Sequence, residues 1–420
     1  MASVIVCSGP HDGHVSPMLG VARQLIARGH RVRFLTGPAY KEAVRASGAE
    51  FVPLGDGAAS APAPSSTTGI AAVREGVRAL VIDPAPGQFL ALSTAIAAEP
   101  ADVVLAEVTF VGAGTLSGLP RKSRPAVIAC GILPSTLSSQ DCAPFGLGLT
   151  PGRGPVARMR NRALNWLVEN VVLRDSQRQV DALMRELTGV GLDGLFVLDW
   201  PRRAELIAQF TVAEFEYPRS DAPESLRFFG PTSRHAAAGV ARPEWWADLD
   251  GSRPVIYVTQ GTVSNADFTA LIAPTLQALA QENVLVVVSA GRRPVEDLPP
   301  LPANARAAGF LPDADLMPKV AVYVTNGGYG GLHYAMENGV PIVVAGDTED
   351  KPEGAARVAW AGVGINLKTG RPTPAAIRNA VRKILSDGRY QTGSRRIGAA
   401  IAASPGVNGL IDEMERLLPR

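Results

Sequence analysis

The sequence has few cysteines and almost no excess charge. Its three cysteines, Cys7, Cys130 and Cys142, are too few and too scattered for a disulfide framework or a zinc site. Their scarcity fits a reducing cytosol, so we expect a cytoplasmic protein. The 41 Lys and Arg residues against 39 Asp and Glu residues give a net charge of only +2, so no nucleic-acid partner is expected.

Long hydrophobic runs are also missing. No apolar stretch approaches the roughly 20 residues that span a bilayer. The first residues, Ser3 to Ser8, are typical of a buried strand, so no signal peptide is expected. We therefore predict neither a transmembrane segment nor a leader.

The signatures of several enzyme classes are absent. No G-x-G-x-x-G or G-x-x-x-x-G-K-[ST] is present, which removes the main support for dinucleotide redox chemistry and P-loop phosphoryl transfer. H-E-x-x-H, C-x-x-C and G-x-S-x-G are absent as well. Two D-x-D pairs occur, at Asp248 and Asp250 and at Asp313 and Asp315. The first lies in a proline-rich segment and the second before a short helix, where Asp is a common cap, so we predict no metal site.

What the sequence does contain is an alternation of short apolar runs with helical patterns, repeated twice. Its 420 residues are 46% hydrophobic, enough for two cores. Near-continuous apolar strands between helices favour parallel, doubly wound sheets. Helical patterns are expected at 17–28, 40–47, 267–280 and 331–338, and strands at 4–7, 32–35, 102–106, 126–129, 255–258, 284–289, 321–325 and 341–345.

Segment 215–254 interrupts this rhythm and is predicted to be a linker, because it holds five prolines without clear periodicity. Segment 55–68 is predicted to be a loop. The fold prediction is α/β, with two Rossmann-like parallel-sheet domains facing across a cleft. The first domain is expected at 1–230 and the second at 231–420.

Two segments are candidates for chemistry. His11 and His14 lie in the loop after the first strand, at the end of the sheet where α/β proteins place ligands. A histidine there is suited to take a proton from a substrate hydroxyl, although it could equally cap the helix or face water. The glycines at 327, 328, 330 and 331 lie between an apolar strand and a helix. That position suits an anion such as a diphosphate, or merely a tight turn.

Several motifs together resemble one family. They are Gly13-His14-Val15-x-Pro17, Gly309-Phe310-Leu311-Pro312, Val324 to Gly331, Gly339-Val340-Pro341-Ile342 and Asp350-Lys351. In order and spacing they are similar to the family-1, UDP-glycosyltransferase-like enzymes, which include bacterial macrolide and antibiotic glycosyltransferases. The resemblance implies the GT-B fold and inverting, metal-independent transfer of a sugar from a nucleoside-diphosphate sugar, which is a substrate, so no cofactor is implied.

The resemblance also implies roles for two residues of the first half. His14 matches the family's general base. Glu107 stands where the family has an orienting aspartate, and a carboxylate one methylene longer still suits that task. Alone, Glu107 could instead be a strand-end carboxylate that meets solvent or an arginine.

For the second half, the resemblance implies donor contacts. Phe310 stands where the family places a nucleobase-stacking Trp, although Phe is more often core. Asp350 matches the acid that binds sugar hydroxyls, and its neighbour Lys351 replaces a Gln. Asn326 and Tyr334 replace the family's His and Glu, and Glu337, one helical turn on, is expected to substitute for the missing Glu. The full set of expected donor residues is Thr262, Phe310, Leu311, Asn326, Gly327, Gly328, Tyr329, Gly330, Gly331, Glu337, Asp350 and Lys351.

The predicted partners are therefore a nucleotide sugar and an apolar, natural-product-like acceptor. The two replacements at Asn326 and Tyr334 leave a non-catalytic nucleotide-sugar-binding helper protein as an alternative. A second alternative is a glycolipid-forming enzyme at a membrane surface, because arginines are interleaved with apolar residues over 153–185. A solvated helix face explains that pattern more simply, so membrane contact is not expected. The sequence does not identify the acceptor, the sugar, the nucleobase or the oligomeric state.

Overall fold

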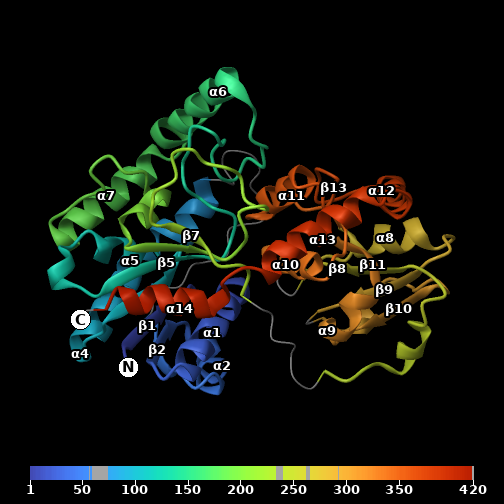
Figure 1. Ribbon diagram of the computed structural model, residues 1–420, viewed down its shortest axis with the longest axis horizontal. Helices are drawn as coiled ribbons and strands as arrows, with labels where there is room; N and C mark the ends of the chain where they lie inside the picture. Colours follow the sequence, from blue (N-terminus) through green and yellow to red (C-terminus); the bar gives the residue numbers. More distant parts are fainter. Residues whose placement is uncertain (56, 59–73, 233–239, 262–264, 292, 419–420) are drawn as a thin grey trace.

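The computed structural model of the protein describes residues 1–55, 57–58, 74–232, 240–261, 265–291 and 293–418. Within them the chain forms two parallel β-sheets with helices packed on them (Figure 1). The first sheet has seven strands in the order β3-β2-β1-β4-β5-β6-β7, and the second has six in the order β10-β9-β8-β11-β12-β13. The prediction of two α/β domains is confirmed.

The strands are short and mostly buried. In the first sheet they are β1 Ser3–Cys7, β2 Arg31–Thr36, β3 Glu50–Pro53, β4 Val103–Glu107, β5 Ala126–Gly131, β6 Leu206–Gln209 and β7 Leu226–Phe228. In the second they are β8 Val255–Thr259, β9 Leu285–Ser289, β10 Ala305–Ala308, β11 Val320–Thr325, β12 Ile342–Val344 and β13 Gly364–Asn366.

The helices follow the strands in alternation. Those of the first half are α1 Asp12–Ala27, α2 Lys41–Ala46, α4 Ala85–Ala98, α5 Val111–Ser117, α6 Gly154–Leu167 and α7 Arg174–Thr188. Those of the second half are α8 Ile272–Leu279, α9 Asp313–Leu316, α10 Tyr329–Glu337, α11 Lys351–Trp360, α12 Pro374–Ser386, α13 Arg389–Ala402 and α14 Gly406–Arg416.

Strand β1 explains the apolar runs. Val4 and Val6 pack in one core cluster, and Ile5 and Cys7 in another, so both faces of the strand are covered. A parallel sheet buried on both faces needs apolar residues at successive positions rather than at alternate ones. The same arrangement holds at β8, whose Tyr257 and Val258 belong to the two clusters of the second domain.

Helix α1 begins at Asp12, so its expected start at Pro17 is wrong. The carbonyl of His11 accepts hydrogen bonds from the backbone N–H groups of His14 and Val15, which starts the helix ahead of the proline. His14 therefore lies in the first turn of α1 rather than in a loop. Gly29 follows the helix with a φ of +85°, as expected for a residue that ends a helix.

The segment predicted as a linker is partly structured. Residues Leu226–Phe228 form the edge strand β7 and pair with β6. A strand of three residues is too short to show an alternating pattern, which explains why it was missed. The predicted loop 55–68 falls almost entirely outside the described residues.

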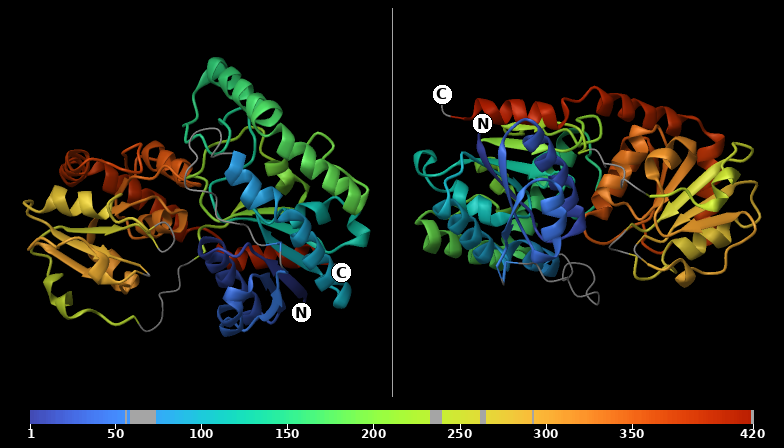
Figure 2. Two further views of the ribbon diagram at one scale, coloured as in Figure 1. Left: turned by 180° about the vertical axis from the view of Figure 1, so that it is seen from behind. Right: turned by 90° about the horizontal axis from the view of Figure 1, so that it is seen from below.

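The last helix returns to the first domain. Val407, Leu410, Ile411 and Met414 of α14 are buried in the core cluster that also contains β1 and α1. The two chain ends consequently lie on the same domain (Figure 2). Helix α14, which the prediction assigns to the second domain, thus packs on the first.

One described helical stretch, Arg74–Ala98, is long and apolar enough to cross a membrane by length and composition, with a mean hydropathy of 1.2. The expectation that no such stretch exists is therefore corrected. Its inward side chains, among them Val81, Ile82 and Leu92, pack in a core cluster of the first domain.

The segment after β6 joins the two domains through buried polar contacts. Thr211 contacts Nε2 of His333 on α10 at 2.6 Å, and the other ring nitrogen lies 2.9 Å from the carbonyl oxygen of Tyr329. The Phe215 ring packs edge-on against His333 at 5.3 Å between centroids. Burial lowers the pKa of His333 to about 4, so its imidazole is neutral at pH 7.

This histidine predicts a loss of stability in acid. Its pKa falls from 6.5 to about 4 on folding, so the unfolded chain binds a proton that the folded chain does not between those values. The free energy of unfolding should therefore decrease as the pH falls through this range, by about 3 kcal/mol from this group. Urea unfolding at several pH values checks this. In the variant His333→Gln, the free energy of unfolding should depend less on pH in this range. An unchanged pH dependence would show that His333 is not responsible for the loss of stability.

Candidate active site

The candidate catalytic residues lie where the strand order of the first sheet changes direction. Strands β1 and β4 are parallel neighbours, with Cys7 opposite Ala106. The chain leaves β1 into α1, which carries His14, and β4 ends at Glu107. Ligands of open α/β sheets bind at such a point, beyond the carboxyl ends of the strands.

His14 and Glu107 form a buried pair, as the sequence predicts. Nδ1 of His14 lies 3.1 Å from Oε1 of Glu107, and their side chains are 18% and 0% exposed. The carboxylate also accepts hydrogen bonds from the hydroxyl of Thr109 at 2.6 Å and from its backbone N–H at 2.7 Å. The backbone N–H of Gly9 is a further donor at 3.2 Å. Glu107 is thus fixed from several sides and does not meet solvent or an arginine.

The pKa directions agree with an ionised Glu107 and a basic His14. Burial would raise the pKa of Glu107, but the charge of His14 and the hydrogen bonds from His14 and Thr109 outweigh it, and the pKa is lowered. Burial would lower the pKa of His14, yet the pKa is raised by Glu107, with smaller contributions from Asp350 and Glu349. An ionised carboxylate only accepts hydrogen bonds, so Nδ1 of His14 carries the proton and Nε2 has the lone pair.

His11 lies beside this pair in a different electrostatic state. Its ring is 5.4 Å from that of His14 in an edge-on arrangement. Burial and the neighbouring His14 lower the pKa of His11, although Glu107 and Glu349 act in the other direction. His14 is the histidine whose Nδ1 lies against the Glu107 carboxylate.

In the second domain, the glycine-rich turn lies at the corresponding change of strand direction, between β8 and β11. The side-chain amide of Asn326 donates to the carbonyl oxygen of Gln260 at 2.7 Å and so joins the ends of these strands. Gly327 has a φ of +96°, and a Cβ there would lie 2.9 Å from the Val344 side chain. Position 327 therefore requires glycine. The turn leads directly into the amino end of α10, where Gly328 and Gly330 are exposed and their backbone is accessible to an anion.

The predicted donor residues differ in whether their side chains reach the surface. Phe310 is 51% exposed and is therefore not a core residue, whereas Leu311 is 6% exposed and packs in the core. Tyr329 is also buried, stacked on Phe215 with ring centroids 6.2 Å apart. The side chains of Leu311 and Tyr329 are thus directed into the core, and only their backbone is left for a donor. Thr262 lies outside the described residues.

Asp350 and Lys351 begin α11 and behave differently. Burial raises the pKa of Asp350, Glu349 raises it further, and the charges of Lys351 and His14 oppose the rise. The charges of Asp350 and His14, which belong to different domains, act on the pKa of each other. The Lys351 side chain is buried, and its ammonium group pairs with Glu349 and contacts Thr348 at 3.3 Å.

Glu337 is the last residue of α10 and is exposed. At about 1.5 Å of rise per residue, it lies roughly 12 Å from the amino end of the helix where the glycine turn is. Its assignment as a ribose contact stays a prediction. Tyr334, which is partly buried and one turn nearer, occupies the family's position.

The D-x-D aspartates are engaged elsewhere. Asp248 pairs with Arg306 at 2.6 Å, Asp315 pairs with Arg242 at 2.8 Å, and Asp313 accepts from the Tyr257 hydroxyl at 3.1 Å. Across the described part of the chain, His, Cys, Asp and Glu side chains form no group of three or more that could hold a metal ion.

Sequence reasoning missed Thr109 and Gln260. A threonine two residues beyond a strand-end carboxylate is placed to bond it locally, and that spacing is the signal that could have identified Thr109. Gln260 accepts from the backbone N–H groups of Leu271 and Ile272 through its side chain, at 3.3 and 3.1 Å. Nothing in the sequence marks this second residue, because its partners follow only from the fold.

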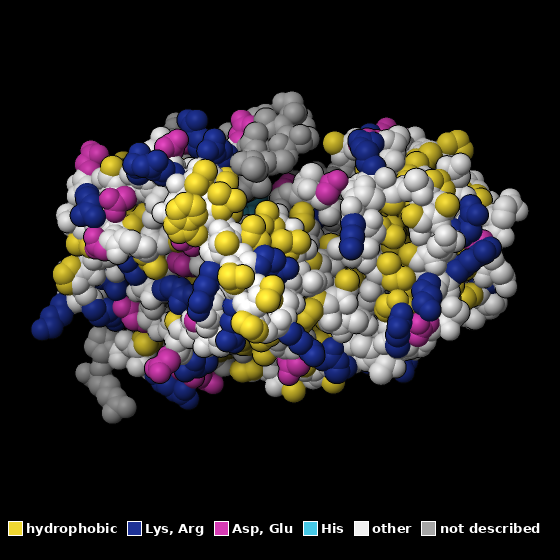
Figure 3. Space-filling model, turned by 90° about the horizontal axis from the view of Figure 1, so that it is seen from above, with side chains coloured by type: hydrophobic (Ala, Val, Ile, Leu, Met, Phe, Trp, Pro, Cys, Tyr) yellow, Lys and Arg dark blue, Asp and Glu magenta, His cyan; other side chains and the backbone are white. Residues whose placement is uncertain are grey.

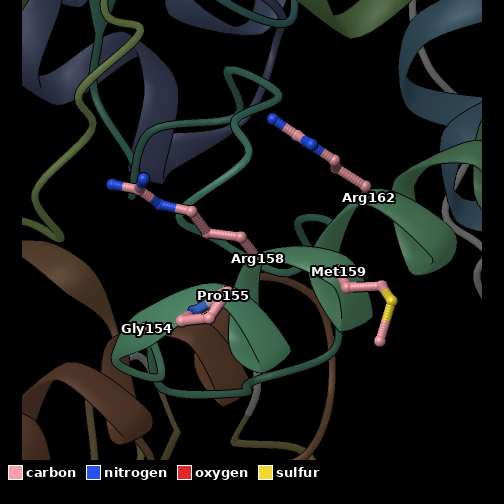
Figure 4. Close-up of a pocket in the computed structure, with 5 residues that line it drawn as sticks. All are labelled: Gly154, Pro155, Arg158, Met159 and Arg162. Carbon is pink, nitrogen blue, oxygen red and sulfur yellow. The ribbon is translucent and has the colours of Figure 1, made fainter.

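Helix α6 lies apart from the site and exposes an apolar face. Val156, Met159 and Trp166 are 72%, 67% and 62% exposed. Seen from above, hydrophobic side chains gather on the face that α6 covers, with arginine and lysine beside them (Figure 3). A surface pocket there is lined by Gly154, Pro155, Arg158, Met159 and Arg162, with both arginines directed to one side and Met159 to the other (Figure 4).

The chain has two parallel-sheet domains, each with a candidate site at the point where its strand order changes direction. This is the architecture of the GT-B class of glycosyltransferases. Residues 5–105 match the glycosyltransferase family 28 N-terminal domain, and residues 273–417 match the erythromycin biosynthesis protein CIII-like C-terminal domain. The chain is 41% identical to 4'-demethylrebeccamycin synthase of Lentzea aerocolonigenes over 99% of this chain and 100% of that protein. It is 32% identical to UDP-glucosyltransferase A1 of Starmerella bombicola over 99% and 92% of the two chains.

Solved structures agree. The glycotransferase of kitacinnamycin matches with a TM-score of 0.76 and 25% identity, covering 100% of this chain and 99% of that one. The calicheamicin glycosyltransferase CalG4 matches in fold with a TM-score of 0.73 and 23% identity, over 99% and 98% of the chains. The chain belongs to the family-1, UDP-glycosyltransferase-like enzymes of the bacterial antibiotic type, and it is a glycosyltransferase.

Proposed function

We propose that this enzyme transfers a sugar from a nucleoside-diphosphate sugar to a hydroxyl of an apolar natural product, with inversion and without a metal ion. The observation that carries the proposal is the buried His14–Glu107 pair, in which Nδ1 lies 3.1 Å from Oε1. The names of the relatives support the substrate classes. One is a synthase of 4'-demethylrebeccamycin, others are UDP-glucosyltransferases, and a spinosyn rhamnosyltransferase of the same fold was solved with thymidine diphosphate.

The mechanism follows from the state of His14. While Nδ1–H donates a hydrogen bond to the Glu107 carboxylate, Nε2 takes the proton of the acceptor hydroxyl as that oxygen attacks the anomeric carbon. The bond from that carbon to the diphosphate oxygen breaks as the new bond forms. A single displacement of this kind inverts the anomeric centre and needs one base. Glu107 stabilises the imidazolium that results, and Asp350 is the predicted partner of the sugar hydroxyls.

The leaving diphosphate would be bound by the glycine turn and the amino end of α10. The exposed backbone at Gly328 and Gly330 and the partial positive charge of the helix end both favour an anion. Asn326 stays a predicted contact of the diphosphate. One hydrogen of its amide nitrogen is donated to the Gln260 carbonyl oxygen, so the second hydrogen is the one available to the diphosphate. Lys351 also stays a predicted donor contact, although its ammonium group is paired with Glu349.

Transfer assays with a panel of UDP- and dTDP-sugars test the proposal. We expect diphosphate release that depends on an aromatic natural-product acceptor, a product whose anomeric coupling constant shows inversion, and an unchanged rate in EDTA. Retention at the anomeric carbon, or a rate lost in EDTA and restored by Mg²⁺, would contradict the mechanism. Sugar-nucleotide binding without any diphosphate release would favour the non-catalytic helper protein instead.

A second candidate, transfer at a lipid surface, is favoured by the exposed apolar face of α6 beside Arg158 and Arg162. An apolar helix face flanked by arginines is suited to an anionic membrane. Co-sedimentation with vesicles containing phosphatidylserine tests it. Binding that is lost in Trp166→Ser and Met159→Ser would support this candidate, and equal recovery of all proteins in the supernatant would dismiss it.

Phe310 gives a prediction for donor binding. Its exposed ring is expected to stack on the nucleobase, so Phe310→Ala should weaken UDP or dTDP binding by about tenfold, since one base stack contributes on the order of 1–3 kcal/mol. Phe310→Trp should keep or improve the affinity. Calorimetry with both nucleotides checks this, with Leu301→Ala as a control, because Leu301 is 41% exposed and has no expected donor role. Equal affinity of Phe310→Ala and wild type would disprove the stack.

A further inference from the structure

A loop of the first domain is hydrogen-bonded to a helix of the second. Residues 142–150 belong to the connection between β5 and α6, and they meet the first turn of α11. The backbone N–H groups of Gly146 and Gly148 both donate to Oε1 of Glu353, at 3.0 and 2.9 Å. Glu353 is only 5% exposed, so this carboxylate is committed to the contact between the domains.

The loop has the backbone that this contact requires. Gly146 and Gly148 have φ values of +97° and +59°, which residues with a side chain rarely adopt. At Gly148 a Cβ would also lie 2.9 Å from the carbonyl oxygen of Pro352, the residue just before Glu353. Position 148 therefore needs a glycine both for its conformation and for its close approach to α11.

The second oxygen of Glu353 connects the contact to the interior. Oε2 accepts from Nη1 of Arg357 at 2.8 Å, and Nε of Arg357 donates to Glu216 at 2.9 Å. Arg357 and Glu216 are each 1% exposed. The other oxygen of Glu216 accepts from the backbone N–H of Ser135, at 3.0 Å, in the same β5–α6 connection. This connection is thus held at two places by one buried network that is centred on α11.

Helix α11 also carries the donor side of the site. Its N-cap is Asp350, three residues before Glu353. The loop after the fifth strand is expected to wall the acceptor site, and Leu147 and Leu149 on either side of Gly148 are 40% and 41% exposed. Such side chains suit an apolar acceptor. The sugar-contacting turn and an acceptor-site loop are therefore joined through one side chain.

We propose that Glu353 is a positioning residue that holds the acceptor loop 142–150 on the helix that begins with Asp350, so that nucleotide binding in the second domain also orders the acceptor loop of the first. The identity of the two substrates rests on the proposed function. The connection between loop 142–150 and helix α11 rests on the hydrogen bonds to Glu353 in the structure.

Kinetics give the first test, with Glu353→Gln, Gly148→Ala and the control Gly154→Ala. Gly154 has a φ of +82° and open space around its Cβ position, so its variant shares the backbone strain but not the contact. Glu353→Gln and Gly148→Ala should raise KM for the acceptor, by about tenfold where one charge-assisted hydrogen bond is lost, with donor affinity within twofold. An equal loss of donor and acceptor affinity, together with a lower Tm, would reduce Glu353 to a structural role and overturn the proposal.

Hydrogen exchange gives a second test that needs no activity. In the wild type, saturating UDP or dTDP should slow amide exchange in 142–150, although the nucleotide binds the other domain. In Glu353→Gln the loop should exchange faster, and the nucleotide should no longer slow it. Loop exchange that the nucleotide leaves unchanged in the wild type would overturn the proposal. A protected loop in a protein that transfers no sugar would instead refute the proposed function.

Discussion

Replacing His14 with alanine should lower kcat by about 10² to 10⁴ while nucleotide affinity stays within twofold of the wild type. The imidazole is partly exposed at the carboxyl end of the first sheet and is bonded to Glu107, whereas the glycine turn expected to bind the diphosphate belongs to the second domain. Loss of the base therefore affects the proton transfer and not the nucleotide. Initial rates at saturating acceptor and calorimetry with UDP or dTDP measure the two effects separately.

His11→Ala is the matched control. His11 lies in the same segment, and its ring is 5.4 Å from that of His14, so its loss disturbs the same surroundings. The pKa of His11 is lowered by burial and by His14, whereas the Glu107 carboxylate is bonded to Nδ1 of His14 and raises the pKa of that residue, so we expect less than a tenfold change in His11→Ala. Activity of His14→Ala within a few-fold of wild type would refute the mechanism. An equal collapse of both variants would show that the segment, not the base, is responsible.

The fold and the pairing of His14 with Glu107 could both be predicted from the sequence. Alternating apolar runs and helical patterns can be recognised locally in the sequence. The strands of a parallel sheet are especially easy to recognise, because successive residues of strands such as β1 and β4 are buried and therefore apolar. The pairing of His14 with Glu107 also follows from topology, since the first strand of a doubly wound sheet lies beside the strand that restarts on its other side. These residues are 93 positions apart, yet the strand order brings them to 3.1 Å.

The directions of individual side chains could not be predicted in the same way. Leu311 and Phe310 are adjacent apolar residues, but one is 6% and the other 51% exposed, and their composition does not distinguish them. Lys351 is a predicted donor residue, and its side chain is buried with the ammonium group paired to Glu349, a partner that the sequence does not indicate. Such outcomes depend on neighbours that the fold supplies from distant parts of the chain.

Long-range contacts between the domains gave no local signal either. Glu353 and Gly148 are 205 residues apart, and α14 returns to a domain that the chain left before residue 230. A glycine in a loop and a glutamate in a helix are ordinary residues when considered alone. Only their φ values, distances and burial show that they hold two domains together.

Asn326 illustrates a change of interpretation at a predicted site residue. Its expected role was that of a weak, neutral donor to the diphosphate in place of the family's histidine. The structure shows a bond of 2.7 Å from its amide nitrogen to the Gln260 carbonyl oxygen, which ties β8 to β11 at the turn. The shape of the anion site therefore depends on this side chain even before any contact with a ligand is considered.

Replacing Glu107 with glutamine should slow transfer and shift its pH dependence to lower pH. Glutamine has the same length and still offers an oxygen to Nδ1 of His14, but it has no charge. Burial alone lowers the pKa of His14, and the charge and hydrogen bond of Glu107 are the main effects that raise it. Because the base must be neutral, the rate rises with pH through this pKa. The acidic limb of kcat/KM should therefore move to lower pH in Glu107→Gln.

The plateau of that profile should fall by about 10² to 10⁴, because the imidazolium formed during transfer is no longer stabilised by a carboxylate. Glu107→Asp restores the charge and the acid that the family commonly has there, so its rate should recover to within about tenfold and its acidic limb should return toward that of the wild type. A Gln variant with the same pH–rate profile as the wild type would show that Glu107 does not act through His14. A slow Asp variant with an unshifted limb would instead show that the reach to Thr109 and Gly9, and not the charge alone, fixes the imidazole.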